Sequence, residues 1–161
     1  MMDIRLRPAS EDDRAFSKRV YVETMRWVIE RLSGWDEARI RATFDKNVVL
    51  AEVRMIVLNG EVIGWLQTAF EDGSMLLKEV YIDGPFQRRG IGTKILNLLF
   101  DEARNAKKTI ALSVVKMSPA LRLYQRLGFQ TTGEDDVKLY MSWDPLVRHD
   151  ASQSTRRGGN H

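Results

Sequence analysis

The sequence predicts a mixed α/β fold, with a mostly antiparallel central sheet of about six to seven strands flanked by about four helices. Apolar runs and stretches of helical periodicity follow in the order strand, two helices, three strands, helix, strand, helix, two strands. This order lacks the repeating strand–helix–strand units of a doubly wound nucleotide fold. The 161 residues indicate one domain over residues 1–145, followed by a polar, disordered tail over residues 146–161.

The first half of the chain is expected to supply one strand, two helices and a three-stranded unit. Residues 4–7 alternate apolar and polar side chains, which is typical of a strand. Ser10 and the acids after it begin a helix that ends at Gly34, and Asp36 begins a second helix that runs to about Phe44. Three strands follow, joined by Asn-Gly and Asp-Gly hairpin signals, over residues 48–58, 62–70 and 75–82.

The second half is expected to supply two helices around a buried strand, and then a hairpin. Apolar residues form one stripe on a helix over residues 88–106. Ser118 and Pro119 begin a shorter helix, which stops at Gly128. The remaining strands lie over residues 109–115, 129–132 and 137–143.

The composition excludes several kinds of catalytic site. The chain has no cysteine, and its two histidines, His149 and His161, both lie at the C-terminal end. Thiolate nucleophiles, a Ser-His-Asp triad and a metal site with His or Cys ligands inside the domain are therefore excluded, and we expect no metal. Any chemistry must rest on carboxylates, tyrosines, backbone amides or a cofactor.

Charge and hydropathy restrict the partners. The formal net charge is +3, and the tail supplies most of it through Arg148, Arg156 and Arg157 against Asp150. The domain itself is close to neutral, so we expect no nucleic-acid partner. The chain has no apolar run of 18 residues, and the residues after Met1 do not resemble a secretory signal. We therefore expect a cytoplasmic protein without a membrane partner.

A glycine-rich turn falls where a predicted strand ends and a predicted helix begins. Residues 87–93 read Gln-Arg-Arg-Gly-Ile-Gly-Thr. A helix N-terminus presents free N–H groups, and Gly90 and Gly92 lack side chains that would keep a phosphate away from them. Arg88 and Arg89 add positive charge, so the turn is suited to a diphosphate. A tight turn without a binding function is the alternative.

Two motifs resemble those of a known family. The pattern Gln-x-x-Gly-x-Gly at residues 87–92 and the sequence Ala-Leu-Arg-Leu-Tyr-Gln-Arg-Leu-Gly-Phe at residues 120–129 resemble two signatures of the GNAT superfamily of N-acetyltransferases. The resemblance covers about residues 3–143, and it implies a GNAT-like fold and acetyl-CoA as cofactor. The sequence departs from the family pattern at Ser118, where asparagine is frequent, and at Gly84, where proline is usual.

The resemblance also implies a reaction, the transfer of an acetyl group from acetyl-CoA to a primary amine of a small molecule or peptide. Tyr124 stands where the family commonly places its general acid, and the ordinary tyrosine pKa of about 10 keeps the hydroxyl protonated at neutral pH. An aromatic packing role is the alternative for Tyr124. The implied cofactor contacts are Val80, Tyr81, Ile82, Gln87, Arg88, Arg89, Gly90, Ile91, Gly92, Thr93, Ser118, Ala120 and Tyr124.

Glu79 is the candidate proton acceptor for the amine. It lies on the strand before the glycine turn among apolar residues, an environment that raises the pKa of a carboxylate. With a strand period of two, Glu79 shares a face with Tyr81, while Val80 and Ile82 share the other. The alternatives are an ion pair of Glu79 with Lys78 or with an N-terminal arginine, and deprotonation of the amine through water without a single base.

The acceptor pocket is expected between the early helices and the final hairpin. Glu23, Trp27, Glu30 and Trp35 are candidates for it, because an acid beside an aromatic ring suits an amine cation. Core positions for the tryptophans and solvated positions for the acids are the alternatives. Dimerisation is common in the family, so a homodimer is a further expectation, although no interface can be identified in the sequence.

Two other functions compete with acetyl transfer. The serine at position 118 also fits a regulatory protein that binds acyl-CoA without catalysis. The arginine-rich tail also fits a nucleic-acid binder, in which case the tail would carry most of the affinity and its salt dependence.

Overall fold

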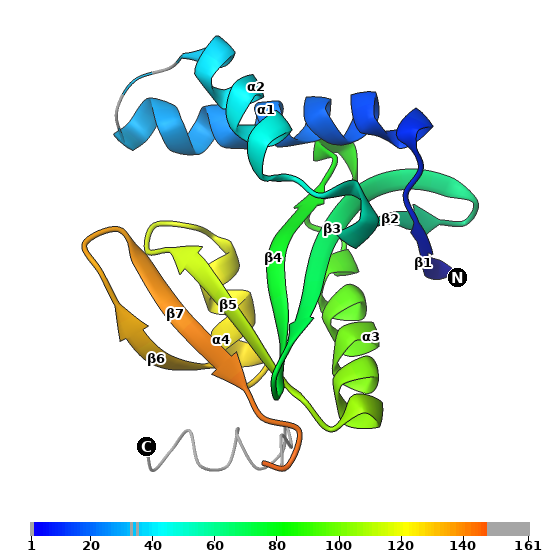
Figure 1. The fold of residues 1–161 in the computed structure, drawn as a ribbon, viewed down its shortest axis with the longest axis vertical. Coiled ribbons are helices and arrows are strands. Elements are labelled where there is room, and N and C mark those ends of the chain that lie inside the picture. Colours follow the sequence, from blue (N-terminus) through cyan, green and yellow to red (C-terminus); the bar gives the residue numbers. More distant parts are fainter. Residues whose placement is uncertain (1, 33, 35, 148–161) are drawn as a thin grey trace.

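The structure, a computed structural model, describes residues 2–147 except residues 33 and 35. Most of the predicted tail, residues 148–161, lies outside the described residues. In the described part, seven strands form one sheet in the order β1-β2-β3-β4-β5-β7-β6 (Figure 1). The strands are β1 (Ile4–Pro8), β2 (Val53–Leu58), β3 (Glu61–Glu71), β4 (Ser74–Ile82), β5 (Thr109–Val115), β6 (Gln130–Glu134) and β7 (Lys138–Trp143).

Four α-helices of the described residues cover the two faces of this sheet. They are α1 (Arg14–Leu32), α2 (Glu37–Asn47), α3 (Ile91–Ala106) and α4 (Ala120–Arg126). One core cluster lies under α3 and α4 and includes Ile95, Leu99 and Tyr124. The other lies under α1 and α2 and includes Tyr21 and Phe44. The predicted fold class and order of elements are therefore confirmed.

Strand pairing is antiparallel throughout the sheet except between β4 and β5. These two strands run parallel and pair over only three residues each, from Ser74 opposite Thr109 to Leu76 opposite Ala111. Beyond that point β4 continues to Ile82 and β5 to Val115 without pairing to each other. The two strands diverge visibly in Figure 1. The sheet therefore opens at its centre.

Two predicted boundaries were wrong. Residues 48–52 are not part of a strand, because α2 extends to Asn47 and a 3₁₀ turn, Leu50–Glu52, precedes β2. Val48 is apolar because it is buried against α1 and α2, and its N–H bonds back to the Phe44 carbonyl. The helix predicted from residue 88 begins at Ile91, since the residues before it adopt turn conformations. No helix in the described part of the chain is long and apolar enough to span a bilayer.

Candidate active site

A β-bulge in β4 decides which side chains face α1. Gln67 of β3 pairs with Glu79 and Thr68 pairs with Leu77, so Lys78 is the extra residue on β4. Before the bulge Leu77 packs toward α3, and after it Val80 packs on that same side. Regular alternation from Leu77 would have sent the Glu79 side chain there too. The bulge instead sends Glu79 and Tyr81 to the opposite face, where Tyr81 packs against the α1 cluster.

The Glu79 carboxylate accepts a hydrogen bond from the Tyr81 hydroxyl. Burial raises the pKa of Glu79, while the bond from Tyr81 and the charges of Lys138 and Lys78 act in the opposite direction. Lys78 pairs with Glu52 at 3.0 Å and Glu79 takes part in no ion pair within the described residues. Glu79 is therefore a half-buried carboxylate held by a phenol.

Tyr124 approaches the same region from the other face of the sheet. It is 7% exposed on α4, and its ring contacts Phe129 at a centroid distance of 5.5 Å. Burial raises the pKa of Tyr124 to about 12, so the hydroxyl is neutral at physiological pH. Burial raises the pKa of Tyr81 well above its ordinary value, and Glu79, Tyr21 and Tyr124 each raise it further. Tyr81 and Tyr124 therefore interact electrostatically from opposite faces of the sheet, in the region where β4 and β5 are not paired.

The glycine turn between β4 and α3 has the geometry of an anion site. Arg88 and Gly90 are both left-handed, with φ of 64° and 77°. The first hydrogen bond of α3 runs from the Lys94 N–H to the Gly90 carbonyl, at 3.4 Å. The N–H groups of Ile91, Gly92 and Thr93 therefore have no acceptor within the helix. Backbone donors at the positive end of a helix suit a diphosphate.

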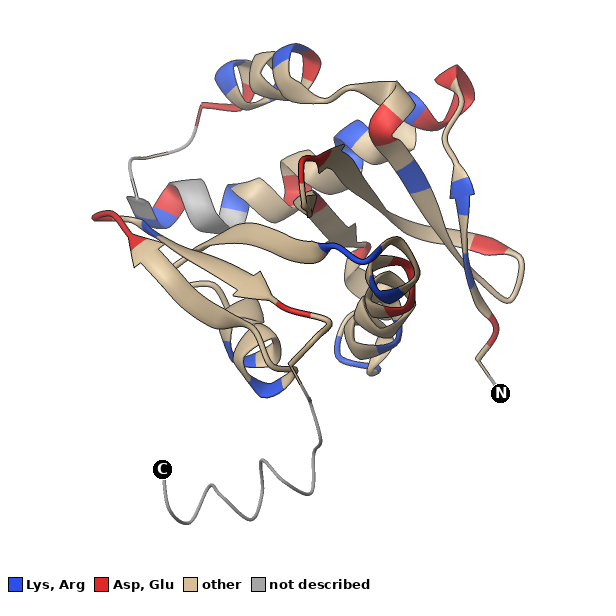
Figure 2. Cartoon of the chain, turned by 60° about the horizontal axis from the view of Figure 1, so that its bottom comes forward, with Lys and Arg blue, Asp and Glu red and all other residues tan. Residues whose placement is uncertain are grey.

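Three cations surround this turn. Arg88, Arg89 and Lys94 are exposed and form no ion pair among the described residues, and Arg89 lies over the ring of Phe86 at 5.4 Å. Elsewhere α1, α2 and α3 carry charges of both signs, whereas α4 carries only Arg122 and Arg126, as Figure 2 shows. The turn therefore adds a local excess of positive charge to a domain that is otherwise close to neutral.

The side chains of Gln87, Asp83 and Arg19 hold the loop that leads into the turn. Gln87 donates its side-chain amide to the Ile82 carbonyl at 2.8 Å, closing the loop on itself. The Asp83 carboxylate accepts the Gly84 N–H at 3.0 Å and also takes two bonds from Arg19 of α1, at 3.0 and 3.3 Å. The end of β4 is thereby tied to α1.

Ser118 and Ala120 lie at the start of α4. The Ser118 hydroxyl accepts the Ala120 N–H at 3.1 Å, so the side chain caps the helix. This satisfies one N–H group of the first turn and leaves the predicted contact of Ser118 with a cofactor untested.

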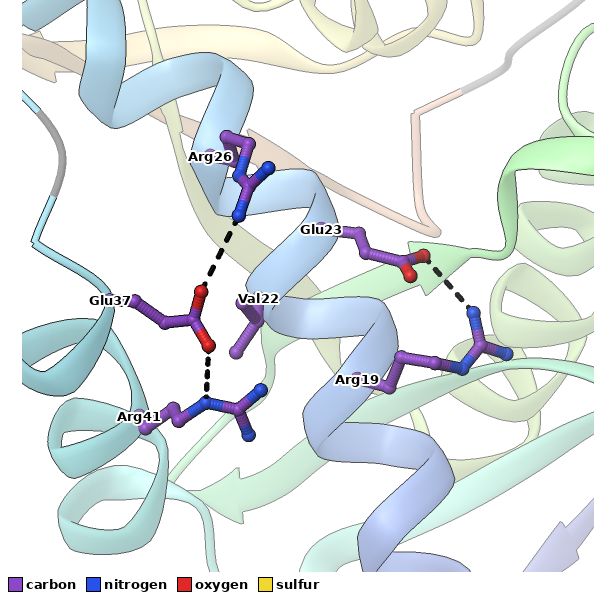
Figure 3. Close-up of a pocket in the computed structure, with 6 residues that line it drawn as sticks. All are labelled: Arg19, Val22, Glu23, Arg26, Glu37 and Arg41. Carbon is purple, nitrogen blue, oxygen red and sulfur yellow. Dashed lines mark hydrogen bonds and ion pairs between the residues drawn. The ribbon is translucent and has the colours of Figure 1, made fainter.

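The acceptor candidates are dispersed along α1 and the segment after it. Glu23 lines a pocket of about 270 Å³ but pairs with Arg19 at 3.0 Å. Glu37, which sequence analysis missed, bonds to Arg41 at 2.9 Å in the same pocket (Figure 3). Glu30 is exposed, and the Trp27 side chain and Trp35 lie outside the described residues. The pocket lining is Arg19, Val22, Glu23, Arg26, Glu37 and Arg41.

Two further residues of the site could not be identified from the sequence. Tyr21 is 6% exposed, and its ring meets that of Tyr81 edge-on at 5.5 Å, but in the sequence it is one more apolar residue of a helix. Gly64 lies on β3 opposite Ile82, where a Cβ atom would come within 2.3 Å of the Tyr81 carbonyl oxygen. Only the pairing of β3 with β4 reveals this close approach.

Comparison with known proteins identifies the family of the chain. The family model described as the acetyltransferase (GNAT) domain matches residues 45–131. A spermine/spermidine N(1)-acetyltransferase of Bacillus subtilis (strain 168) is 38% identical over 69 residues, which are 41% of this chain and 45% of that protein. The match thus spans about half the length of that relative.

Solved structures share the fold at low sequence identity. The PaiA N-acetyltransferase of Thermoplasma acidophilum, solved with coenzyme A, has a TM-score of 0.75 at 18% identity over 88% of this chain and 99% of that one. The ribosomal-protein-S18-alanine N-acetyltransferase of Escherichia coli has a TM-score of 0.61 at 20% identity over 92% and 96% of the two chains. Because the family model covers more than half of the sequence, the chain belongs to the GNAT acetyltransferase family.

Proposed function

We propose that the protein transfers an acetyl group from acetyl-CoA to a primary amine of a small molecule or peptide. The observation that carries the proposal is the opening of the sheet between β4 and β5. A half-buried carboxylate and a buried phenol flank this opening, and a glycine turn suited to a diphosphate follows β4 directly. Each feature fits either a part of acetyl-CoA or a step of its reaction.

The residues around the opening fit acetyl-CoA in two places. The β4 backbone from Val80 to Ile82 has no strand paired on the β5 side, so its polar groups can bind an extended pantetheine arm. The free N–H groups of α3, with Arg88 and Arg89, can bind the diphosphate. The bound cofactor supplies the acetyl thioester, which is the electrophile of the reaction.

Two side chains perform the proton transfers in this proposal. Glu79 accepts a proton from the ammonium form of the acceptor, because only the neutral amine is a nucleophile. Tyr124 donates its hydroxyl proton to the leaving sulfur, and its raised pKa keeps that proton in place through neutral pH. In the described residues the Tyr124 hydroxyl makes no hydrogen bond that would compete for this role.

The acceptor is the least determined part of the proposal. The curated relative carries a polyamine in its name, and one structural neighbour is named for a protein N-terminus, so both kinds of amine belong in the test. Glu23 and Glu30 are the acidic candidates of the described residues for binding the cation. The ion pair of Glu23 with Arg19 must be exchanged for one with the amine if Glu23 takes part.

The test is coenzyme A release from acetyl-CoA with spermidine, spermine, lysine and an alanine-initiated peptide as acceptors. We expect turnover of at least one amine, together with a rise in Tm on addition of acetyl-CoA alone. A rise in Tm without turnover of any amine would favour the regulatory acyl-CoA-binding alternative. No rise at millimolar acetyl-CoA would refute the proposal.

A further inference from the structure

The hydroxyl of Tyr81 and the carboxylate of Glu79 form a pair on the α1 face of β4. Tyr81 donates to Oε1 of Glu79, while Oε2 accepts no hydrogen bond from the described residues. One oxygen is thus fixed and the other is left for a further donor. Strand alternation places both side chains on one face, and the bulge at Lys78 makes this the α1 face.

We propose that Tyr81 is a positioning residue for acetyl transfer, which orients Glu79 so that Oε2 accepts the proton of the acceptor amine. The proposal rests on the proposed function above, and it assigns Tyr81 a role beyond the cofactor contact expected from its place in the strand. Tyr81 acts through Glu79 and does not itself exchange a proton in the reaction.

The Tyr81 ring is held in place by two aromatic neighbours. The ring of the fully buried Trp65 of β3 lies 5.1 Å from the Tyr81 ring, measured between ring centroids. The ring of Tyr21 of α1 meets the Tyr81 ring edge-on at a centroid distance of 5.5 Å. Rotation of the ring away from Glu79 would break both contacts, which stabilise a buried aromatic pair. The hydroxyl is therefore directed at Glu79 by the core, before any substrate binds.

The groups that face the pair come from four elements. Tyr21 of α1 and Lys138 of β7 interact with Glu79, as does Lys78 of β4 itself, and Tyr124 of α4 interacts with Tyr81. Burial raises the pKa of Glu79, whereas the hydrogen bond from Tyr81 lowers it. The pKa of Tyr81 is far above its ordinary value, so the phenol stays a donor at any working pH.

The proton step balances without any other reactant. The N–H bond of the ammonium breaks, an O–H bond forms on Oε2, and the electron pair stays on nitrogen for attack on the thioester. The carboxylic acid then releases its proton to solvent after the product leaves. Tyr81 keeps its proton and its bond to Oε1 throughout.

The test compares Tyr81→Phe with Tyr21→Phe, because both remove one phenol hydroxyl from the same pair of contacting rings. In the ligand-free protein, ¹³C NMR of carboxyl-labelled glutamate follows the titration of Glu79, assigned with Glu79→Gln. We expect Tyr81→Phe to move the Glu79 midpoint upward by about one pH unit, the effect of losing one hydrogen bond to a charged group. Tyr21→Phe should leave the midpoint in place.

Kinetics then give a second readout. Acetyl-CoA and the fastest amine of the panel serve as substrates. In Tyr81→Phe the midpoint of the acid limb of the kcat/KM profile should move to higher pH by the same amount, and the rate should recover at high pH. A uniform loss at all pH values, or an unmoved NMR midpoint, would overturn the inference and assign Tyr81 a packing role.

Failure of the proposed function has a different signature. If no amine is acetylated, the proposed function and the proton role both fail, whatever the NMR titration gives. If amines are acetylated but Glu79→Gln keeps the wild-type rate and profile, acetyl transfer stands and the assignment to Glu79 and Tyr81 is refuted.

Discussion

Replacing Gly64 by alanine should displace the strand that carries the proton acceptor. An ideal Cβ on Gly64 would lie 2.3 Å from the Tyr81 carbonyl oxygen and 3.1 Å from the Ile82 Cα, both of them backbone atoms. Contacts of Cβ below 3.0 Å are essentially never seen, so β3 and β4 must separate by at least 3.0 minus 2.3, or 0.7 Å. No flexible side chain can absorb this movement at the shortest contact.

The expected cost follows from that displacement. Overpacking a well-packed core costs 1–3 kcal/mol, and a backbone clash belongs at the upper end, so we expect Gly64→Ala to lower the free energy of unfolding by about 3 kcal/mol. In a domain of this size that corresponds to a fall in Tm of roughly 6–12 °C. Because the moved residues neighbour Glu79, kcat/KM should fall by about 100-fold in the protein that remains folded.

The assays are urea unfolding and coenzyme A release, with Gly133→Ala as the matched control. Gly133 also lies in a strand without a positive φ, and its Cβ would meet no atom within 4 Å. We expect the control to change the free energy of unfolding by less than about 0.5 kcal/mol. If Gly64→Ala matches that control in stability and activity, the close approach of β3 to β4 does not constrain the site.

Three further outcomes are expected. The double change Arg88→Ala and Arg89→Ala should weaken binding of coenzyme A by about 10-fold in titration calorimetry, and this effect should shrink at high salt. The control Lys46→Ala on α2 should leave the binding unchanged. Equal effects of both variants would contradict the anion site. Tyr124→Phe should lower kcat by about 100-fold with an unchanged Kd for acetyl-CoA, and an unchanged kcat would remove Tyr124 as the acid. Glu79→Gln should raise the free energy of unfolding more at pH 8 than at pH 4.5. In the wild type the folded pKa of Glu79 lies above the unfolded value of 4.5, so ionisation of this half-buried carboxyl costs stability as the pH rises through the folded pKa. A pH-independent difference between Glu79→Gln and the wild type would mean that burial does not shift Glu79.

Local signals predicted most of the fold because they depend on near neighbours in the chain. Helical periodicity, turn dipeptides and the glycine turn placed the elements in the right order, and the left-handed Gly90 confirms why glycine stands there. The same reasoning failed at Val48, since an apolar residue at the end of a helix resembles the start of a strand. Burial against another helix, and not strand pairing, explains that residue.

The candidate site was only partly predictable. Glu79 and Tyr81 could be placed on a common face, and Tyr124 could be named from the motif around it. Tyr21 could not be found, because nothing in a helical pattern indicates which strand residue its ring will meet. Trp27 and Trp35 stay predictions, since the first side chain and the second residue lie outside the described part.

By itself the sequence determined which residue types are available and the order of strands and helices, since both follow from composition and short-range pattern. Without cysteine, and with histidine only at the C-terminal end, proton transfer within the domain was limited to carboxylates and phenols. Tertiary structure alone decided the register. The bulge at Lys78 turns Glu79 from the α3 face to the α1 face, and the early end of β4–β5 pairing opens the sheet beside it. A one-residue shift in pairing changes the face of every later side chain, and that shift depends on a partner strand distant in sequence.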